Sequence, residues 1–257
     1  TSENVKKTNH TVNLPSGIVA SDLLIILFAT DQAPVVTGPA GWNQLKNLPE
    51  SAGACRLVVF NMKADGTEGA SVTVTTNASV TSAHIVYRIS DADILTVLPI
   101  RPEVSTGTQG LSAAPNPDSL SPISGEGDYL WIAAGVSDGG RSFTVAPADY
   151  TNLLNSDSGN QSDDVACGSA RRILHAATEA PTAFTIDASD EWVALTIAVY
   201  PIPLREPEYP DFIPRRRVPL QGFFTRGYAA DELAALVPFG WFHQQADVIR
   251  PPHQVSL

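Results

Sequence analysis

The sequence predicts an all-β fold, and three observations lead to that prediction. The 257-residue chain holds Gly 18 and Pro 20 against only 17% charged residues, a composition typical of many turns and short connections. The segments between those turns are rich in Val, Thr and Ile, which favour strands over helices. The third observation is an internal repeat that keeps its order along the chain.

The repeat begins with "LPSGIVASDLLIILFATD", which matches "LSPISGEGDYLWIAAGVSD". Both contain a turn with glycine, an Asp, an apolar strand and a second turn with Asp. "PAGWNQL" then matches "PADYTNL", and we align "GACRLVVFNMKA" with "GSARRILHAATEA" and "GASVTVTT" with "PTAFTIDA". Each half closes with a long strand, "AHIVYRI" or "VALTIAV". Shared local composition does not preserve order over such a distance, so we infer a duplicated β unit.

The individual strands are predicted from the spacing of their apolar residues. Leu23–Phe28 is apolar at every position, as in a central strand covered on both faces. In Ala83–Ile89 the apolar residues alternate, which predicts one buried face. We expect His84 and Arg88 to lie on the other face of this strand, as solvated surface residues.

These strands predict a β-sandwich of jelly-roll or immunoglobulin-like type. It is formed either by two pseudo-repeated units in tandem or by two halves that close one shared core. We place the first repeat at residues 1–100, a linker rich in Pro, Gly, Ser and Thr at 101–118, the second repeat at 119–200 and a C-terminal arm at 201–257.

Charge and composition restrict the class of partner. The formal net charge is −11, and the whole acidic excess lies in residues 1–200, which disfavours nucleic acid as a partner. Cys55 and Cys167 are too few for a disulfide scaffold or a zinc site and are predicted to be buried thiols. No apolar run reaches the ~20 residues of a membrane span, so membrane insertion is not expected. The N-terminus has lysines but lacks the apolar stretch of a signal peptide, which predicts synthesis in the cytoplasm.

The sequence carries none of the common catalytic signatures. G-x-S-x-G, H-E-x-x-H, phosphate-binding and dinucleotide-binding motifs are absent, and we expect no enzyme activity, no cofactor and no metal. Two acidic turns, Asn155–Asp164 and Asp187–Glu191, offer oxygen ligands for calcium, but they lack the spaced D-x-D-x-D-G pattern and are also typical of exposed turns. A hydrolase of surface polysaccharide would have only such unpaired acidic residues to use.

Trp42 and Tyr150 occupy equivalent positions in the two repeats, each after a Pro-Ala turn. Two interpretations are open for this pair. Aromatic faces pack well on sugar rings, so the two residues are candidates for glycan binding. Alternatively, both rings plug the core of their repeat, which is the interpretation that the shared turn favours.

The C-terminal arm differs in character from the rest of the chain. Its many prolines predict extended or polyproline-like backbone, as in "YPDFIPRRRVPLQGFF", and one short helix is predicted at Ala229–Val237. Solvent-exposed linkers avoid the aromatic residues found here. The arm therefore either covers an edge of its own sandwich or docks on a neighbouring subunit, and its length favours the second. The predicted partner-binding residues are Tyr209, Phe212, Arg215, Arg216, Arg217, Phe223, Phe224, Leu233, Leu236, Trp241 and Phe242, with the arginines facing acidic surface.

Residues 9–200 resemble a group of bacteriophage virion and tail structural proteins. The resemblance is carried by "HTVNLPSGIVASDLLIILFATD", "PAGWNQL", "KADGTEGASVTVTT" and "GSARRILHAATEAPTAFTIDASDEWVALTIAV". It implies a non-enzymatic β-sandwich protein located in the virion, as a capsid decoration, collar, tail or fibre component. The expected partners are other virion proteins and copies of the chain itself, in a homo-oligomer. The alternative is a carbohydrate-binding module for adhesion to a host surface glycan.

Overall fold

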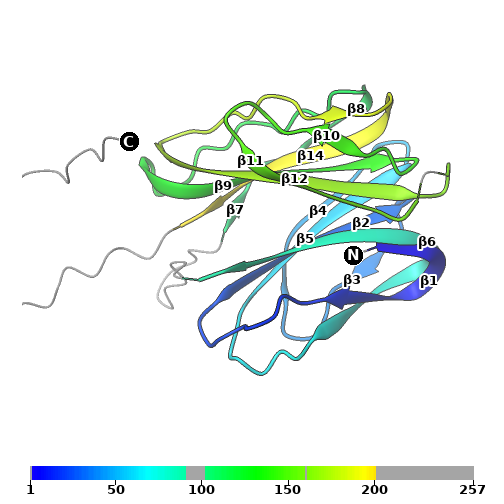
Figure 1. Cartoon of the computed structure of the whole chain (residues 1–257), viewed down its shortest axis with the longest axis horizontal. Coiled ribbons are helices and arrows are strands. Elements are labelled where there is room, and N and C mark those ends of the chain that lie inside the picture. The colour runs from blue at the N-terminus through cyan, green and yellow to red at the C-terminus, as the bar shows by residue number, and fades with distance from the viewer. Residues whose placement is uncertain (1, 91–101, 160, 201–257) are drawn as a thin grey trace, which may run out of the picture. The chain divides into compact units, whose positions relative to one another are not determined.

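The computed structural model describes residues 2–90, 102–159 and 161–200, and these residues form an all-β body (Figure 1). The predicted fold class is confirmed: two six-stranded antiparallel sheets are accompanied by one two-stranded sheet. Within the described residues no helix is long and apolar enough to cross a membrane. The predicted C-terminal arm and its short helix lie outside the described residues.

The first sheet has the strand order β1-β6-β2-β5-β4, and β3 pairs with β6 off this path. Its strands are β1 (Ser2–Asn13), β2 (Leu23–Asp31), β3 (Val36–Thr37), β4 (Asn43–Pro49), β5 (Cys55–Lys63) and β6 (Ser71–Ile89).

The second sheet has the order β11-β12-β9-β14-β7, and β8 also pairs with β14. Its strands are β7 (Glu103–Val104), β8 (Thr108–Ser112), β9 (Gly127–Asp138), β11 (Thr151–Asp157), β12 (Val165–Ala176) and β14 (Asp190–Val199). The small sheet pairs β10 (Phe143–Val145) with β13 (Thr185–Ile186).

The strand register displays the duplication directly. Across the first sheet, Ile85 lies opposite Leu27, Leu27 opposite Val59, and Val59 opposite Lys46. The corresponding row of the second sheet is Leu195, Ala134, Ser169 and Leu154. Val59 therefore corresponds to Ser169. The alignment of "GACRLVVFNMKA" with "GSARRILHAATEA" is therefore wrong, because it does not place Val59 with Ser169.

One buried cluster is shared by both sheets. It combines alternate residues of β2 and β5, such as Leu27 and Val59, with alternate residues of β9 and β14, such as Ile132 and Leu195. Side chains of the two inner faces thus pack together as in a sandwich. The Tyr87 hydroxyl and Ser169 Oγ lie 2.7 Å apart in a buried hydrogen bond that joins the sheets.

Each repeat also has a second cluster on the far face of its sheet. In the first repeat Ile26, Phe28 and Phe60 pack beneath Val12 and Val74. In the second, the far-face cluster includes Tyr129, Trp131, Phe143, Phe184 and Ile186. Of the two arrangements that the sequence left open, the shared core is therefore present, together with a small additional cluster in each half.

Full coverage on both faces explains the composition of β2. Every residue of Leu23–Asp31 is buried, as predicted for an apolar central strand. The same coverage makes the expectation for His84 wrong. His84 is 2% exposed and lies opposite Phe28 in the register, because its face of β6 is covered by the far-face cluster instead of water. Arg88 is partly exposed and forms an ion pair with Asp22.

The segment predicted as a linker contributes strands to the second sheet. Thr108–Ser112 pairs with Ala194–Asp190, and Glu103–Val104 pairs with the end of β14. Asp118 fixes the turn between these strands, since its carboxylate accepts hydrogen bonds from Ser105 and Thr106 and from the backbone N–H of Gly107. Serine, threonine and glycine are thus used here for turn and edge-strand contacts.

Candidate functional site

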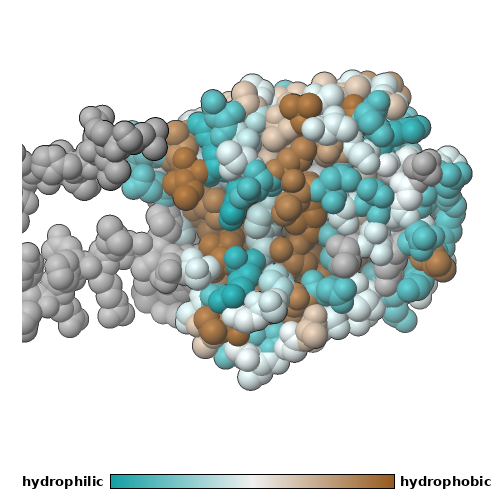
Figure 2. Space-filling view, in the orientation of Figure 1, coloured by the Kyte–Doolittle hydropathy of each residue, from teal (hydrophilic) through white to brown (hydrophobic). Residues whose placement is uncertain are grey.

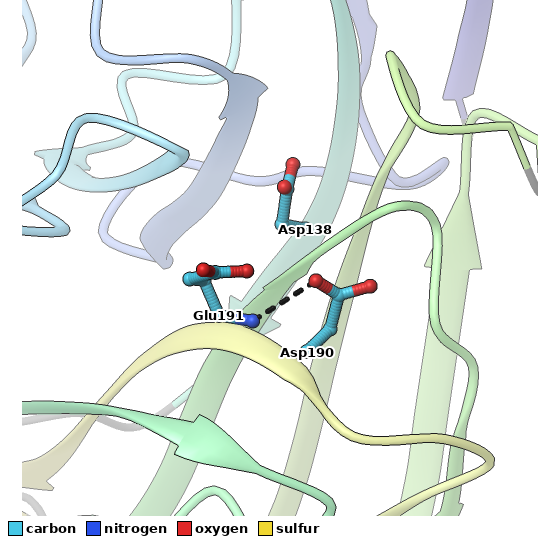
Figure 3. Close-up of side chains that lie close together, drawn as sticks. All are labelled: Asp138, Asp190 and Glu191. Atoms are coloured by element: carbon cyan, nitrogen blue, oxygen red, sulfur yellow. Dashed lines mark hydrogen bonds between the residues drawn. The ribbon is translucent and has the colours of Figure 1, made fainter.

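Two surface features of the body combine groups that could interact with a partner: an acidic cluster and an apolar trough. The acidic cluster consists of Asp138, Asp190 and Glu191, whose carboxylate oxygens lie within 4.8 Å of one another. Asp138 ends β9, and the other two residues begin the neighbouring strand β14 (Figure 3). Antiparallel pairing of these strands brings the three side chains together.

The partners of the three carboxylates differ. Asp190 Oδ2 lies 2.9 Å from Nε of Arg141 in an ion pair, and Asp190 Oδ1 accepts a hydrogen bond of 3.1 Å from the Glu191 backbone N–H. Oδ1 of Asp138 has no hydrogen-bond partner among the described residues. Burial raises the pKa of Asp138 to about 7, and the negative charges of Asp190, Asp31 and Glu191 act in the same direction, against a hydrogen bond from Gly139.

Chemically, the acidic cluster offers oxygen atoms only. Hard cations such as Ca²⁺ take six to eight oxygen ligands, and this cluster supplies three side chains that are all partly exposed. We assign no ion to it. Of the acidic turns considered in the sequence, Asp187–Glu191 contributes two of these residues, while Asp138 was not singled out. The available signal was the repeat, since an Asp ends the first long strand of each half at Asp31 and Asp138.

The second turn, Asn155–Asp164, uses its polar atoms internally. Ser158 donates from its backbone to the Val165 carbonyl and from Oγ to Asp164 Oδ1, at 3.0 Å in both cases. Asp163 forms an ion pair of 3.0 Å with Lys6 of β1, and its carbonyl accepts a hydrogen bond from Thr81. These contacts join the loop between β11 and β12 to the first sheet.

The apolar feature, which we name the edge trough, consists of two adjoining hollows that share Pro15, Val86 and Leu154. It lies where β6 of the first sheet faces β11 of the second. Leu154 is 41% exposed there, a high value for a leucine that borders the space between two sheets. Figure 2 shows one face of the body, on which apolar atoms form bands that cross both layers.

Two arginines flank the edge trough. Arg88 is neutralised by Asp22, with Nε 2.5 Å from Oδ2, and it also donates to the Ser16 carbonyl at 3.3 Å. Arg171 is exposed, and among the described residues no carboxylate pairs with it. In the amide orientation that satisfies both groups, the side-chain oxygen of Asn152 accepts from Arg171 Nε at 3.0 Å and from Nη2 at 2.8 Å. The Arg171 charge is thus held in place by a neutral group.

The two residues predicted to bind glycan differ in their burial. Tyr150 is 7% exposed, its hydroxyl donates to Glu179 Oε1 at 3.2 Å, and Arg172 lies 5.5 Å from its ring centroid. A ring in this position has no free face for a sugar, so Tyr150 is a core residue and its proposed glycan role is corrected. Trp42 is partly buried against the far-face cluster of the first repeat. Tyr150 thus plugs the core of its repeat, whereas glycan binding by Trp42 stays a prediction.

Cys55 and Cys167 are free, buried thiols, as predicted, and both belong to the shared core. The predicted residues of the C-terminal arm, from Tyr209 to Phe242, lie outside the described residues.

These features define the class of the molecule by architecture: an all-β protein in which two antiparallel sheets enclose a common core. Comparison of the chain with protein-family models, with curated proteins and with solved structures found no match.

Proposed function

We propose that this chain is a non-enzymatic structural protein of a tailed-bacteriophage virion, held to neighbouring subunits by its C-terminal arm. The observation that carries the proposal is the boundary between body and arm. The three buried clusters of the described body are formed by residues from Val12 to Tyr200. The chain then continues for 57 residues that contain aromatic side chains and three consecutive arginines.

The composition of the arm supports an anchoring role. Aromatic residues and arginines are enriched among the residues that dominate binding energy at protein interfaces. The body supplies an acidic counterpart, since the net charge of −11 arises from residues 1–200. On a particle with many copies, the arm of each chain would meet the acidic body of a neighbouring copy. The resemblance of residues 9–200 to virion and tail proteins points to the same role.

Deletion of residues 205–257 tests the proposal. The truncated chain is expected to retain its β-sheet circular dichroism spectrum and cooperative unfolding, because the buried clusters lie before this segment. It is also expected to be lost from assembled particles, measured by immunoblotting of purified virions. Normal incorporation of a folded truncated chain would contradict the anchor.

A further inference from the structure

We propose that two copies of this chain bind each other through the projecting strip, a surface at the end of β12. The projecting strip consists of five side chains: Arg171, Ile173 and His175 of β12, Asp128 of β9, and Glu126 directly before β9. The inference goes beyond the proposed function, because it is drawn from the body alone and does not need the C-terminal arm.

The first step is the position of the strip on β12. Alternate side chains of a strand lie on the same face, and the pairing of β12 with β9 is regular throughout. Cys167 and Ser169 are fully buried on the inner face of the second sheet. The next three residues of that face, Arg171, Ile173 and His175, are exposed. The inner face therefore extends beyond the part that the first sheet covers.

The contacts of β6 show where this coverage ends. The Thr81 hydroxyl donates to the Asp163 carbonyl at 2.6 Å, and the Tyr87 hydroxyl lies 2.7 Å from Ser169 Oγ. Both pairs have the same sequence separation of 82 residues, so β6 and β12 run in the same direction. Strand β6 continues for two residues after Tyr87, whereas β12 continues for seven after Ser169. The end of β12 thus projects past the end of β6.

The second step compares the two repeats at the centre of the strip. Ile173 is 80% exposed, although it lies on the inner face of its sheet. Its equivalent in the first repeat is Lys63, since Ile173 lies opposite Leu130 of β9 as Lys63 lies opposite Leu23 of β2. The fold therefore accommodates a lysine here and does not require an apolar residue. A partner that covers Ile173 would remove its apolar area from water.

The third step is the charge at the two ends of the strip. Arg171 is held by a neutral amide oxygen, and no carboxylate among the described residues pairs with it. At the other end, His175 Nδ1 lies 3.0 Å from Asp128 Oδ1, and Nε2 lies 3.7 Å from Glu126 Oε1. Two carboxylates outnumber one imidazole, so this end is negative whether or not the ring is protonated. The strip is thus positive at one end and negative at the other.

This distribution makes the strip complementary to itself. When two strips meet antiparallel about a two-fold axis at Ile173, Arg171 of each copy lies opposite His175 of the other, beside Asp128 and Glu126. The two isoleucines then cover each other. Elsewhere the net charge of −11 makes two copies repel, so the strip is a local exception. Five side chains form a smaller surface than the ~800 Å² per partner of a standard interface, so we expect association that depends on concentration.

Charge reversal tests this arrangement, with full-length chains in sedimentation velocity at low ionic strength over a range of concentrations. Wild type is expected to associate. One variant carries Arg171→Glu, and the other carries Glu126→Lys and Asp128→Lys. Each variant alone brings like charges together across the axis and is expected to associate at least about tenfold more weakly. Their equimolar mixture restores opposite charges at both contacts and is expected to form one-to-one dimers. All three side chains are exposed, so the variants are expected to fold.

Disulfide cross-linking tests the position of the axis. Oxidation of an Ile173→Cys chain is expected to give a covalent dimer on a non-reducing gel, because the two Cβ atoms meet within the ~4 Å that a disulfide requires. The native Cys55 and Cys167 are buried and do not compete. Lys63→Cys, at the equivalent exposed position of the first repeat, is the matched control and is expected to stay uncross-linked.

Four outcomes would each overturn the inference: a wild-type chain that stays monomeric, an Arg171→Glu chain that associates like wild type, a mixture of the charge-reversed chains without dimers, or equal cross-linking at positions 173 and 63. Association through the C-terminal arm alone would not respond to these substitutions. The anchor proposal is judged separately by incorporation of the truncated chain into particles.

Discussion

Replacement of Asp138 by asparagine should stabilise the protein at neutral and alkaline pH but not at acidic pH. Burial and neighbouring carboxylates raise the pKa of Asp138 from 3.8 to about 7. A raised pKa in the folded state means that folding favours the protonated form. The contribution of this carboxyl to stability is therefore complete below about pH 4 and is lost as the pH rises through about 7.

The size of the effect follows from the pKa and the exposure of the group. A fully enclosed carboxyl with this pKa would cost about 4 kcal/mol when ionised. Asp138 is partly exposed, so solvent screens its charge and we expect roughly 1–2 kcal/mol instead. Asparagine keeps the shape of the side chain and its acceptor oxygen. It adds an amide that can donate to the neighbouring carboxylates.

The assay is urea unfolding of wild type and Asp138→Asn at pH 4 and pH 8. The free energies of unfolding should agree within about 0.5 kcal/mol at pH 4 and differ by roughly 1–2 kcal/mol at pH 8, with the variant more stable. Asp149→Asn is the control, since its carboxylate is 85% exposed and lies outside the acidic cluster. An Asp138→Asn chain that is no more stable than wild type at pH 8 would refute the reasoning.

The remaining predictions concern the contacts between the two sheets. Tyr87→Phe should lower the free energy of unfolding by about 1 kcal/mol, because it removes a buried hydrogen bond to Ser169, and a double-mutant cycle with Ser169→Ala should recover this coupling. Leu27→Ala should cost about 2–5 kcal/mol and shift a single unfolding transition of the whole body, since Leu27 belongs to the cluster that both sheets share. Separate unfolding transitions for the two halves would contradict a common core.

The strands could be predicted from the sequence because the same order of turns and apolar segments occurs in both halves of the chain. Leu23–Phe28 is apolar throughout, and full burial of β2 agrees with that pattern. His84 was mispredicted because alternation alone does not reveal what covers the second face of a strand. The far-face cluster that buries it is built from β1, β2, β3, β5 and β6, which are distant in the sequence.

The candidate site was less predictable, because it depends on pairings between strands. Asp138 and Glu191 are far apart in the sequence and meet through the register of β9 with β14. The edge trough requires β6 and β11, from different repeats, to face each other across the sandwich. No local pattern contains that information, since many sandwich topologies have the same alternation of apolar and polar residues.

The duplicated architecture provides an internal comparison that a single sandwich lacks. Lys46 and Leu154 occupy equivalent positions in the two sheets. Lys46 lies on the edge strand β4 opposite Val59 of β5, and Leu154 lies on the edge strand β11 opposite Ser169 of β12. Edge strands commonly carry lysine and proline, which discourage unwanted pairing, and β4 has both Lys46 and Pro49. Strand β11 has Leu154 where β4 has this lysine. Because the backbone setting is equivalent, the fold does not require an apolar residue there. The two repeats therefore share the backbone position but differ in the residue that their edge strand exposes, with Leu154 41% exposed in the second.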